Sequence, residues 1–199
     1  MKTLTLADLI NEDELSELSA RYGSGQRHQV TVDISAVAYD EWLEKMVRHP
    51  SRRGEVVLVI QRPDGRVLLH TKRFYPKAVF RLPSGGVHPD EAVLAGLTRE
   101  AKEETGLDVS VDRFLGTVEY EFRNNRRRLP FVSYLFLLQA DSSRPLAQDS
   151  GEGITGFRYV SPAELRQVAT QLRELPSRWA DWGHFRALAH DIVADALQS

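Results

Sequence analysis

One segment, residues 85–107, combines a glycine-rich loop with a helix that carries several acidic side chains. At about 100° per residue, Glu100, Glu103 and Glu104 fall on one side of this helix, beside its apolar stripe. Carboxylates crowded at a partly buried surface raise one another's pKa and are unfavourable unless a cation lies between them. We therefore expect a divalent cation that prefers oxygen ligands, Mg²⁺ or Mn²⁺. The apolar stripe consists of Val93, Leu97 and Ala101.

Composition excludes several classes of partner and metal site. With 26 basic and 28 acidic residues, the chain has a formal charge of −2 and lacks the positive field that nonspecific binding to duplex nucleic acid requires. It contains no cysteine, so a metal site must use oxygen or imidazole ligands. A length of 199 residues, 42% of them hydrophobic, suits one well-filled core with decorated ends.

The beginning of the chain predicts a cytoplasmic protein. Its first thirty residues contain five acidic side chains and no long apolar run, which argues against a secretory signal. No stretch of the sequence approaches a membrane span, so we expect no membrane partner.

Residues 1–50 are expected to form an N-terminal extension of helix, strand and helix. Leu6 to Tyr22 has amphipathic spacing and stops at a glycine pair, which predicts one helix. Gln29 to Ile34 alternates like a short strand, and Ala36 to Arg48 again has helical spacing.

From Gly54 onward, strands and helices alternate. The strands expected at 55–61 and 66–71 are joined by a Pro-Asp-Gly turn, and a short strand at 79–82 leads into the glycine loop. Asp90 is expected to N-cap the acidic helix, and Gly106 to end it in a left-handed conformation. Next we expect a half-exposed strand over 117–123, a turn at Asn124 and a strand covered on both faces over 131–140. A strand at 157–160 follows. The chain then has a helix start at Ser161 and a last helix from Pro176 to Leu197. This order predicts an α/β fold in which helical layers cover a mixed sheet.

The spacing of the glycines, acids and arginine between Gly85 and Leu107 resembles the Nudix box of the Nudix hydrolases. The resemblance implies an α/β/α sandwich with a mixed sheet, and it covers roughly Gly54 to Leu175. We accordingly expect a Nudix domain over residues 51–175, preceded by the extension and followed by a C-terminal helix over 176–199. The matching positions are Gly85, Glu91, Arg99, Glu100, Ala101, Glu103, Glu104, Gly106 and Leu107.

The same resemblance implies a set of roles. Glu100 and Glu104 correspond to metal ligands, Glu103 ligates directly or through water, and the backbone carbonyl of Ser84 is a further ligand. Arg99 would pair with Glu103 or Glu91 and so hold the carboxylates in position. The implied reaction is hydrolysis of the diphosphate bond in a nucleoside diphosphate linked to another moiety.

Three residues remain candidates for the general base of this reaction. Glu103 and Glu100 lie on the acidic helix, and Glu152 lies in a loop between two glycines that would permit it to move. As an alternative, Glu152 is an ordinary solvated loop residue.

Substrate binding is expected around the glycine loop. Gly85 and Gly86 allow a phosphate to approach the backbone near a helix N-terminus, and Arg81 and Arg73 are candidate phosphate contacts. The stretch from Phe80 to Gly86 is similar to that of ADP-ribose hydrolases, although Arg81 stands where an acid is usual. ADP-ribose, nucleoside triphosphates and dinucleoside polyphosphates all stay open as substrates.

Other charged and aromatic residues offer further candidate sites. The arginines at 126–128 predict either a solvated hairpin tip or a phosphate contact, and His184 and His190 are about 240° apart on one helix, so they cannot share a metal. Trp179, Trp182 and Phe185 are expected to pack the last helix onto the sheet or a second subunit, or to stack on a base. A nucleotide sensor that does not cleave its ligand is the alternative function, and the extension suggests a homodimer.

Overall fold

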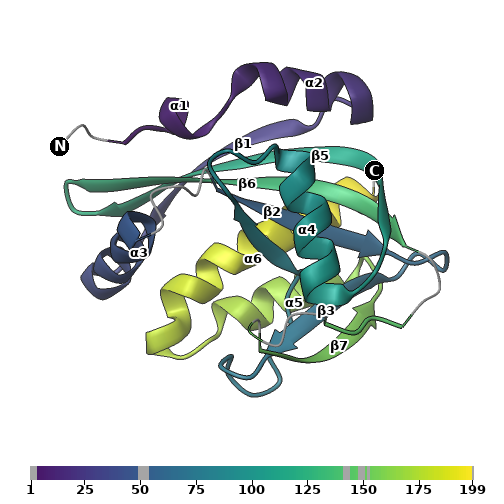
Figure 1. Ribbon diagram of the computed structural model, residues 1–199. Helices are drawn as coiled ribbons and strands as arrows, with labels where there is room; N and C mark the ends of the chain where they lie inside the picture. The colour runs from purple at the N-terminus through teal and green to yellow at the C-terminus, as the bar shows by residue number, and fades with distance from the viewer. Residues whose placement is uncertain (1–3, 49–53, 141–143, 148–150, 152, 199) are drawn as a thin grey trace.

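The computed structural model describes residues 4–48, 54–140, 144–147, 151 and 153–198. Within them, seven strands form one mixed sheet in the order β1-β5-β6-β2-β3-β7, with β4 paired to β2 (Figure 1). The strands are β1 (Gln26–Asp33), β2 (Gly54–Gln61), β3 (Val67–Lys72), β4 (Ser84–Val87), β5 (Val109–Asn124), β6 (Arg127–Ala140) and β7 (Ile154–Val160). The helices are α1 (Leu6–Leu9), α2 (Glu12–Tyr22), α3 (Ala36–Arg48), α4 (Val93–Thr105), α5 (Glu164–Arg173) and α6 (Ser177–Gln198).

Helices cover both faces of the sheet, as the sequence predicted. Strand β2 shows this directly, because Val56, Leu58 and Ile60 join one hydrophobic cluster and Val57 and Val59 join the other. The first cluster includes side chains from α1, α2 and α4, and the second includes side chains from α3, α5 and α6. Both faces of a strand in this position must be apolar, which explains why its sequence does not alternate.

The N-terminal segment is part of this architecture. Strand β1 pairs in parallel with β5 and forms one edge of the sheet. Helix α3 begins after Ser35, which donates to a carboxylate oxygen of Asp181 on α6 at 2.6 Å. The Tyr39 hydroxyl of α3 donates to the carbonyl of Arg128 at 3.0 Å. Helix α3 is therefore attached to both α6 and the hairpin between β5 and β6.

Two expectations for the N-terminal half were wrong. The single helix expected over Leu6 to Tyr22 is broken, because the Asn11 side chain accepts from the amides of Asp13 and Glu14 and starts α2 anew. Helix α4 has Ala92 at its N-cap instead of Asp90, and no side chain of its own caps it. Glu14 of α2 accepts from the Val93 amide at 2.6 Å, so a distant segment satisfies this helix end.

Two strands also differ from expectation. The strand expected at 79–82 is a single bridge between His70 and Arg81, whereas the glycine loop itself forms β4, antiparallel to β2. The strand expected to be half exposed is buried on both faces at its centre, since β1 lies beside it and Arg27 of β1 pairs with Glu119 at 2.5 Å. Sequence alternation could not show that another segment covers the polar face.

Other local predictions are confirmed. Gly106 ends α4 with a φ of 68°, and Asn125 forms the β5–β6 turn with a φ of 54°. At that turn, Arg127 pairs with Asp40 of α3 at 2.6 Å and Arg128 pairs with Glu121 at 3.0 Å, so both bind protein carboxylates. Among the helices in the described ranges, none is long and apolar enough to cross a membrane.

The crossing of α5 and α6 generates the first testable prediction. A Cβ atom at Gly183 would lie 2.1 Å from the Leu172 carbonyl oxygen. Although alanine usually stabilises a helix relative to glycine, Gly183→Ala should lower the free energy of unfolding by about 1–3 kcal/mol, measured in urea, because the helices must separate. The control is Gly156→Ala, whose Cβ would meet its nearest neighbour at 3.4 Å and should change stability by less than about 0.5 kcal/mol. Unchanged stability of Gly183→Ala would contradict this tight packing.

Candidate functional site

The acidic helix α4 is packed against the glycine strand β4. A Cβ atom at Gly85 would lie 1.8 Å from the carboxyl carbon of Glu100, so only glycine permits this approach. Val93, Leu97 and Ala101 are buried as the helical spacing predicted, and Glu100 is only 7% exposed. The contact between Gly85 and Glu100 therefore sets the position of the carboxylate relative to the loop.

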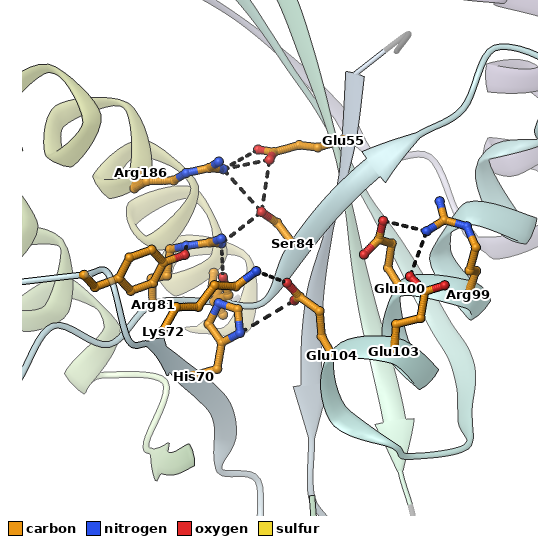
Figure 2. Close-up of polar contacts among 12 residues, drawn as sticks. Glu55, His70, Lys72, Arg81, Ser84, Arg99, Glu100, Glu103, Glu104 and Arg186 are labelled. Carbon is orange, nitrogen blue, oxygen red and sulfur yellow. Dashed lines mark hydrogen bonds and ion pairs between the residues drawn. The ribbon is translucent and has the colours of Figure 1, made fainter. Parts of the chain in front are cut away.

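Arg99 binds four groups beside the middle of this helix, and Figure 2 shows two of them, Glu100 and Glu103. Its guanidinium donates to Glu91 through two nitrogens, at 2.8 and 2.9 Å, and to the carbonyl of Gly86 at 2.8 Å. The third nitrogen donates to Glu100 at 2.7 Å and to Glu103 at 3.1 Å. The hydrogen bonds from Arg99 lower the pKa of Glu91 to about 2. This arrangement keeps Glu100 and Glu103 side by side.

Glu104 points to a different set of partners. Its side chain is fully buried, one oxygen lies 2.8 Å from Nζ of Lys72, and the other lies 3.6 Å from Nδ1 of His70. Burial raises the pKa of Glu104 to about 7, although the nearby charge of Lys72 opposes the shift. Burial likewise keeps the pKa of His70 well below its ordinary value, so the imidazole is neutral. Lys72 is thus the cation closest to Glu104.

Glu100, Glu103 and Glu104 offer the oxygen ligands that a hard divalent cation prefers. In this structure, however, their three carboxylates do not converge on one point. Over the described ranges, no three Asp, Glu or His side chains are close enough to share a metal ion. Arg99 lies between Glu100 and Glu103, and Lys72 lies against Glu104. Positive groups therefore already occupy the neighbourhood of each carboxylate. Carboxylate oxygens are the ligands that Mg²⁺ or Mn²⁺ prefers, so a metal would bind here once Arg99 and Lys72 move away from them.

Ser84 is the centre of a second buried network (Figure 2). Its hydroxyl donates to Glu55 at 3.0 Å and accepts from Arg81 at 2.9 Å. Arg186 of α6 donates to both oxygens of Glu55 at 2.7 Å. Burial alone would raise the pKa of Glu55, but the charges of Arg186 and Arg81 outweigh it and the pKa is lowered. Glu55 of β2 therefore connects β4, through Ser84, with α6, through Arg186.

The two arginines expected to contact substrate lie in different surroundings. Arg81 is 5% exposed, and its guanidinium donates to the Tyr75 hydroxyl at 2.7 Å, the Leu82 carbonyl at 2.6 Å and Ser84. Arg73 is exposed and its side chain lies against Gly153. Their substrate contacts stay predictions. Glu152, the loop candidate for the general base, lies outside the described residues.

His190 has a supporting role that the sequence did not reveal. Its Nε2 accepts from the amide of Leu82 at 3.0 Å, and Nδ1 lies 2.8 Å from the carbonyl of Arg186, to which it donates. Burial lowers the pKa of His190 to about 3, so the ring is neutral and holds this tautomer. It thereby joins α6 to the segment that precedes β4.

A cavity of about 300 Å³ opens beside these groups. Part of its lining is polar and comes from Lys45, Glu55, Lys72, Ser84, Gly85, Gly86, Glu100 and Arg186. The other part is apolar and comes from Trp42, Met46, Phe122, Leu129, Phe131, Trp182 and Phe185. This combination is characteristic of small-molecule sites, where polar groups orient a ligand held between apolar walls.

Sequence reasoning missed several of these residues. Glu55 carried a signal, because it is the one acid in the otherwise apolar or neutral stretch from Gly54 to Gln61. Arg186 and His190 carried none, since their partners are more than a hundred residues away in the chain. Trp42 and Met46 carried no signal of a site either, because nothing local shows that α3 reaches the cavity.

Comparison with known proteins gives one family match and several relatives. The family model of the NUDIX domain matches residues 51–182. Phosphatase NudJ of Escherichia coli strain K12 is 26% identical over 113 residues, covering 57% of this chain and 71% of that protein. The protein of the same name from Shigella flexneri matches equally.

Two solved structures match a larger part of the chain at lower identity. The dihydroneopterin triphosphate pyrophosphohydrolase of E. coli is 18% identical, with a TM-score of 0.46, and the match covers 67% of this chain and 95% of that one. The binary complex of a C. elegans Ap4A hydrolase is 16% identical, with a TM-score of 0.47, and the match covers 73% and 99% of the two chains.

His190 makes stability depend on pH. Its folded pKa of about 3 is below its ordinary value of 6.5, so the unfolded chain binds the proton more readily. The stabilisation is present above pH 6.5 and is lost as the pH falls toward 3, with a slope of up to about 1.4 kcal/mol per pH unit. His190→Gln should reduce the slope of unfolding free energy between pH 6 and pH 4 by about that amount, measured by urea titration at several pH values.

The matched control is His184→Gln, because His184 is exposed on the same helix. That variant should keep the wild-type slope. An unchanged slope in His190→Gln would show that other groups, such as the buried His70, account for the acid sensitivity.

Proposed function

Because this chain belongs to the Nudix hydrolase family, we propose that it is a metal-dependent pyrophosphohydrolase that cleaves the diphosphate bond of a nucleoside diphosphate derivative. ADP-ribose-like compounds and nucleotides are the substrate classes that the proposal covers. One observation carries it: Glu100, fitted against Gly85, lines a cavity that also presents Lys72 and the glycine loop. Oxygen donors, a cation and open backbone in one cavity suit a charged diphosphate.

The proposed metal ligands are the carboxylates of Glu100, Glu103 and Glu104 and the backbone carbonyl of Ser84. A bound Mg²⁺ or Mn²⁺ would supply charge neutralisation at the phosphates and a more acidic water. Arg99 positions Glu100 and Glu103 through hydrogen bonds of 2.7 and 3.1 Å. Lys72 balances the charge of Glu104, the most deeply buried of the three carboxylates. These contacts hold each carboxylate in a defined position, from which the three must shift to reach one metal ion.

The general base is proposed to be Glu103 or Glu100, with Glu152 as the loop alternative. Access to water favours Glu103 as the base, since 39% of its side chain is exposed. Glu100 is more deeply buried, but its position in the cavity lining favours it as the alternative. Proton abstraction requires a carboxylate that is ionised and close to water. Arg99 contacts both residues and so holds their side chains in position.

Phosphate binding is proposed for the glycine loop and the cations around it. Gly85 and Gly86 line the cavity with backbone that a phosphate can approach closely, and Lys72 lines the same space. Arg81 and Arg73 are kept as further phosphate contacts. The first would have to exchange its protein partners to reach a substrate, whereas the second is exposed.

A homodimer formed through the N-terminal extension and a cytoplasmic location stay predictions. Helix α3 offers two exposed apolar side chains, Val37 at 68% and Val47 at 59%, that a second copy could cover.

A substrate panel tests the proposed reaction. Nucleoside triphosphates, ADP-ribose, NADH and dinucleoside polyphosphates are incubated with Mg²⁺ or Mn²⁺, and released phosphate and nucleotide are measured. We expect metal-dependent hydrolysis of at least one compound, and no turnover when a chelator replaces the metal. Tight binding of a nucleotide without any product would instead support the nucleotide sensor.

Glu104→Gln tests the carboxylate assignment. The substitution removes a charge and keeps the side-chain volume, so kcat should fall by at least about 100-fold, since even groups that only support metal ligands contribute 10- to 100-fold. The matched control is Glu17→Gln on the exposed face of α2, which should keep wild-type activity. Thermal unfolding of both variants shows whether the fold persists. Full activity of Glu104→Gln with metal present would reject this role.

A further inference from the structure

The polar and apolar parts of the cavity lining meet at α6, and β6 joins them through a residue that binds Glu55. Arg186, which binds Glu55, also lies over the ring of the preceding residue, Phe185, at 4.3 Å from its centroid. On β6, Ser133 donates to Glu55 at 2.8 Å, and Phe131 lies two residues earlier on the same face, about 7 Å along the strand. A small molecule could therefore contact both parts at once.

Three separate segments build the apolar part. Helix α3 supplies Trp42 and Met46, the β5–β6 hairpin supplies Phe122 and Phe131, and α6 supplies Trp182 and Phe185. The Trp42 ring centroid lies 4.7 Å from that of Phe122 and 5.7 Å from that of Phe185. Phe122 and Phe185 are buried, at 2% and 7% exposure, whereas Trp42 and Met46 are only partly buried. The side chains from α3 thus retain surface that a ligand could cover.

Helix α3 is held firmly enough to act as a wall. The Ser35 hydroxyl donates a hydrogen bond to Asp181 of α6 at 2.6 Å. The Tyr39 hydroxyl donates one to the Arg128 carbonyl of the β5–β6 hairpin at 3.0 Å. These contacts join α3 to the other two segments that supply aromatic rings. A wall arranged before binding avoids part of the ordering cost of association.

We propose that Trp42 and Met46 of the N-terminal extension complete a subsite for the planar aromatic ring of the substrate, next to the glycine loop that receives its phosphates. The proposal rests on the proposed function for the position of the phosphates and adds the part of the substrate that α3 recognises. Stacking of a base on an aromatic side chain increases affinity by about 10- to 100-fold. Trp42 is accordingly a specificity-determining residue that favours ring-bearing over ringless phosphates.

Binding without turnover tests the subsite. The four nucleoside 5′-monophosphates and ribose 5-phosphate, which has no base, are titrated into the full chain with Mg²⁺ by calorimetry. We expect at least one nucleotide to bind the wild type about 10- to 100-fold more tightly than ribose 5-phosphate. Trp42→Ala should reduce this ratio to within about threefold of unity, and Trp42→Phe should restore most of it, because the aromatic face is retained.

Val47→Ala is the matched control, since Val47 lies on the same helix, is 59% exposed and does not line the cavity. It should keep the wild-type ratio. Thermal unfolding establishes that each variant is folded. If Trp42→Ala does not fold, Met46→Gln replaces it with Val47→Gln as control, and only Met46→Gln should lower the ratio.

Two results would overturn the subsite. One is a wild type that binds every nucleotide no more tightly than ribose 5-phosphate, and the other is a folded Trp42→Ala variant that keeps the full ratio. Neither depends on hydrolysis, so failure of the enzymatic proposal would show only in the substrate panel. A chain that hydrolyses diphosphates but shows no ring preference would lose the subsite and keep the proposed function.

Discussion

Buried charge must be paired, and this requirement organises the centre of the molecule. Glu55, Glu100 and Glu104 are each less than a tenth exposed. Glu55 and Glu104 lie against cations from other segments, and Glu100 lies against its neighbour Arg99. An uncompensated carboxylate in such surroundings would destabilise the fold strongly, so the cations are as necessary as the acids. The pairs connect β2 to α6 and β3 to α4. Stability and the candidate site thus depend on the same contacts.

The extension before the Nudix domain takes part in this organisation. Strand β1 completes one edge of the sheet, Glu14 satisfies the first amide of α4, and α3 lines the cavity. The acidic helix therefore begins at a point that a residue of α2 helps to set. Proteins that share only the central domain need not share these contacts. This gives a physical route by which one family can bind different substrates with the same acidic helix.

Local patterns were sufficient for most elements but not for their boundaries or partners. The stripe of Val93, Leu97 and Ala101 identified α4, and Gly106 identified its end, because both depend on neighbours within one or two turns. The break at Asn11 and the cap from Glu14 were missed, because competing side chains and a distant acceptor decide them. Strand β4 was missed because glycines in a loop carry no strand pattern, although they pair with β2.

The sequence by itself determined the family, the acidic helix and the Gly85 position that its carboxylate requires, since these are encoded in residues close together in the chain. Only the tertiary structure decided that Glu104 faces Lys72 and His70, that Arg186 binds Glu55, and that Trp42 reaches the cavity. The physical reason is distance along the chain. Pairing of buried charges and packing of aromatic rings join segments whose sequences contain no sign of one another until the sheet brings them together.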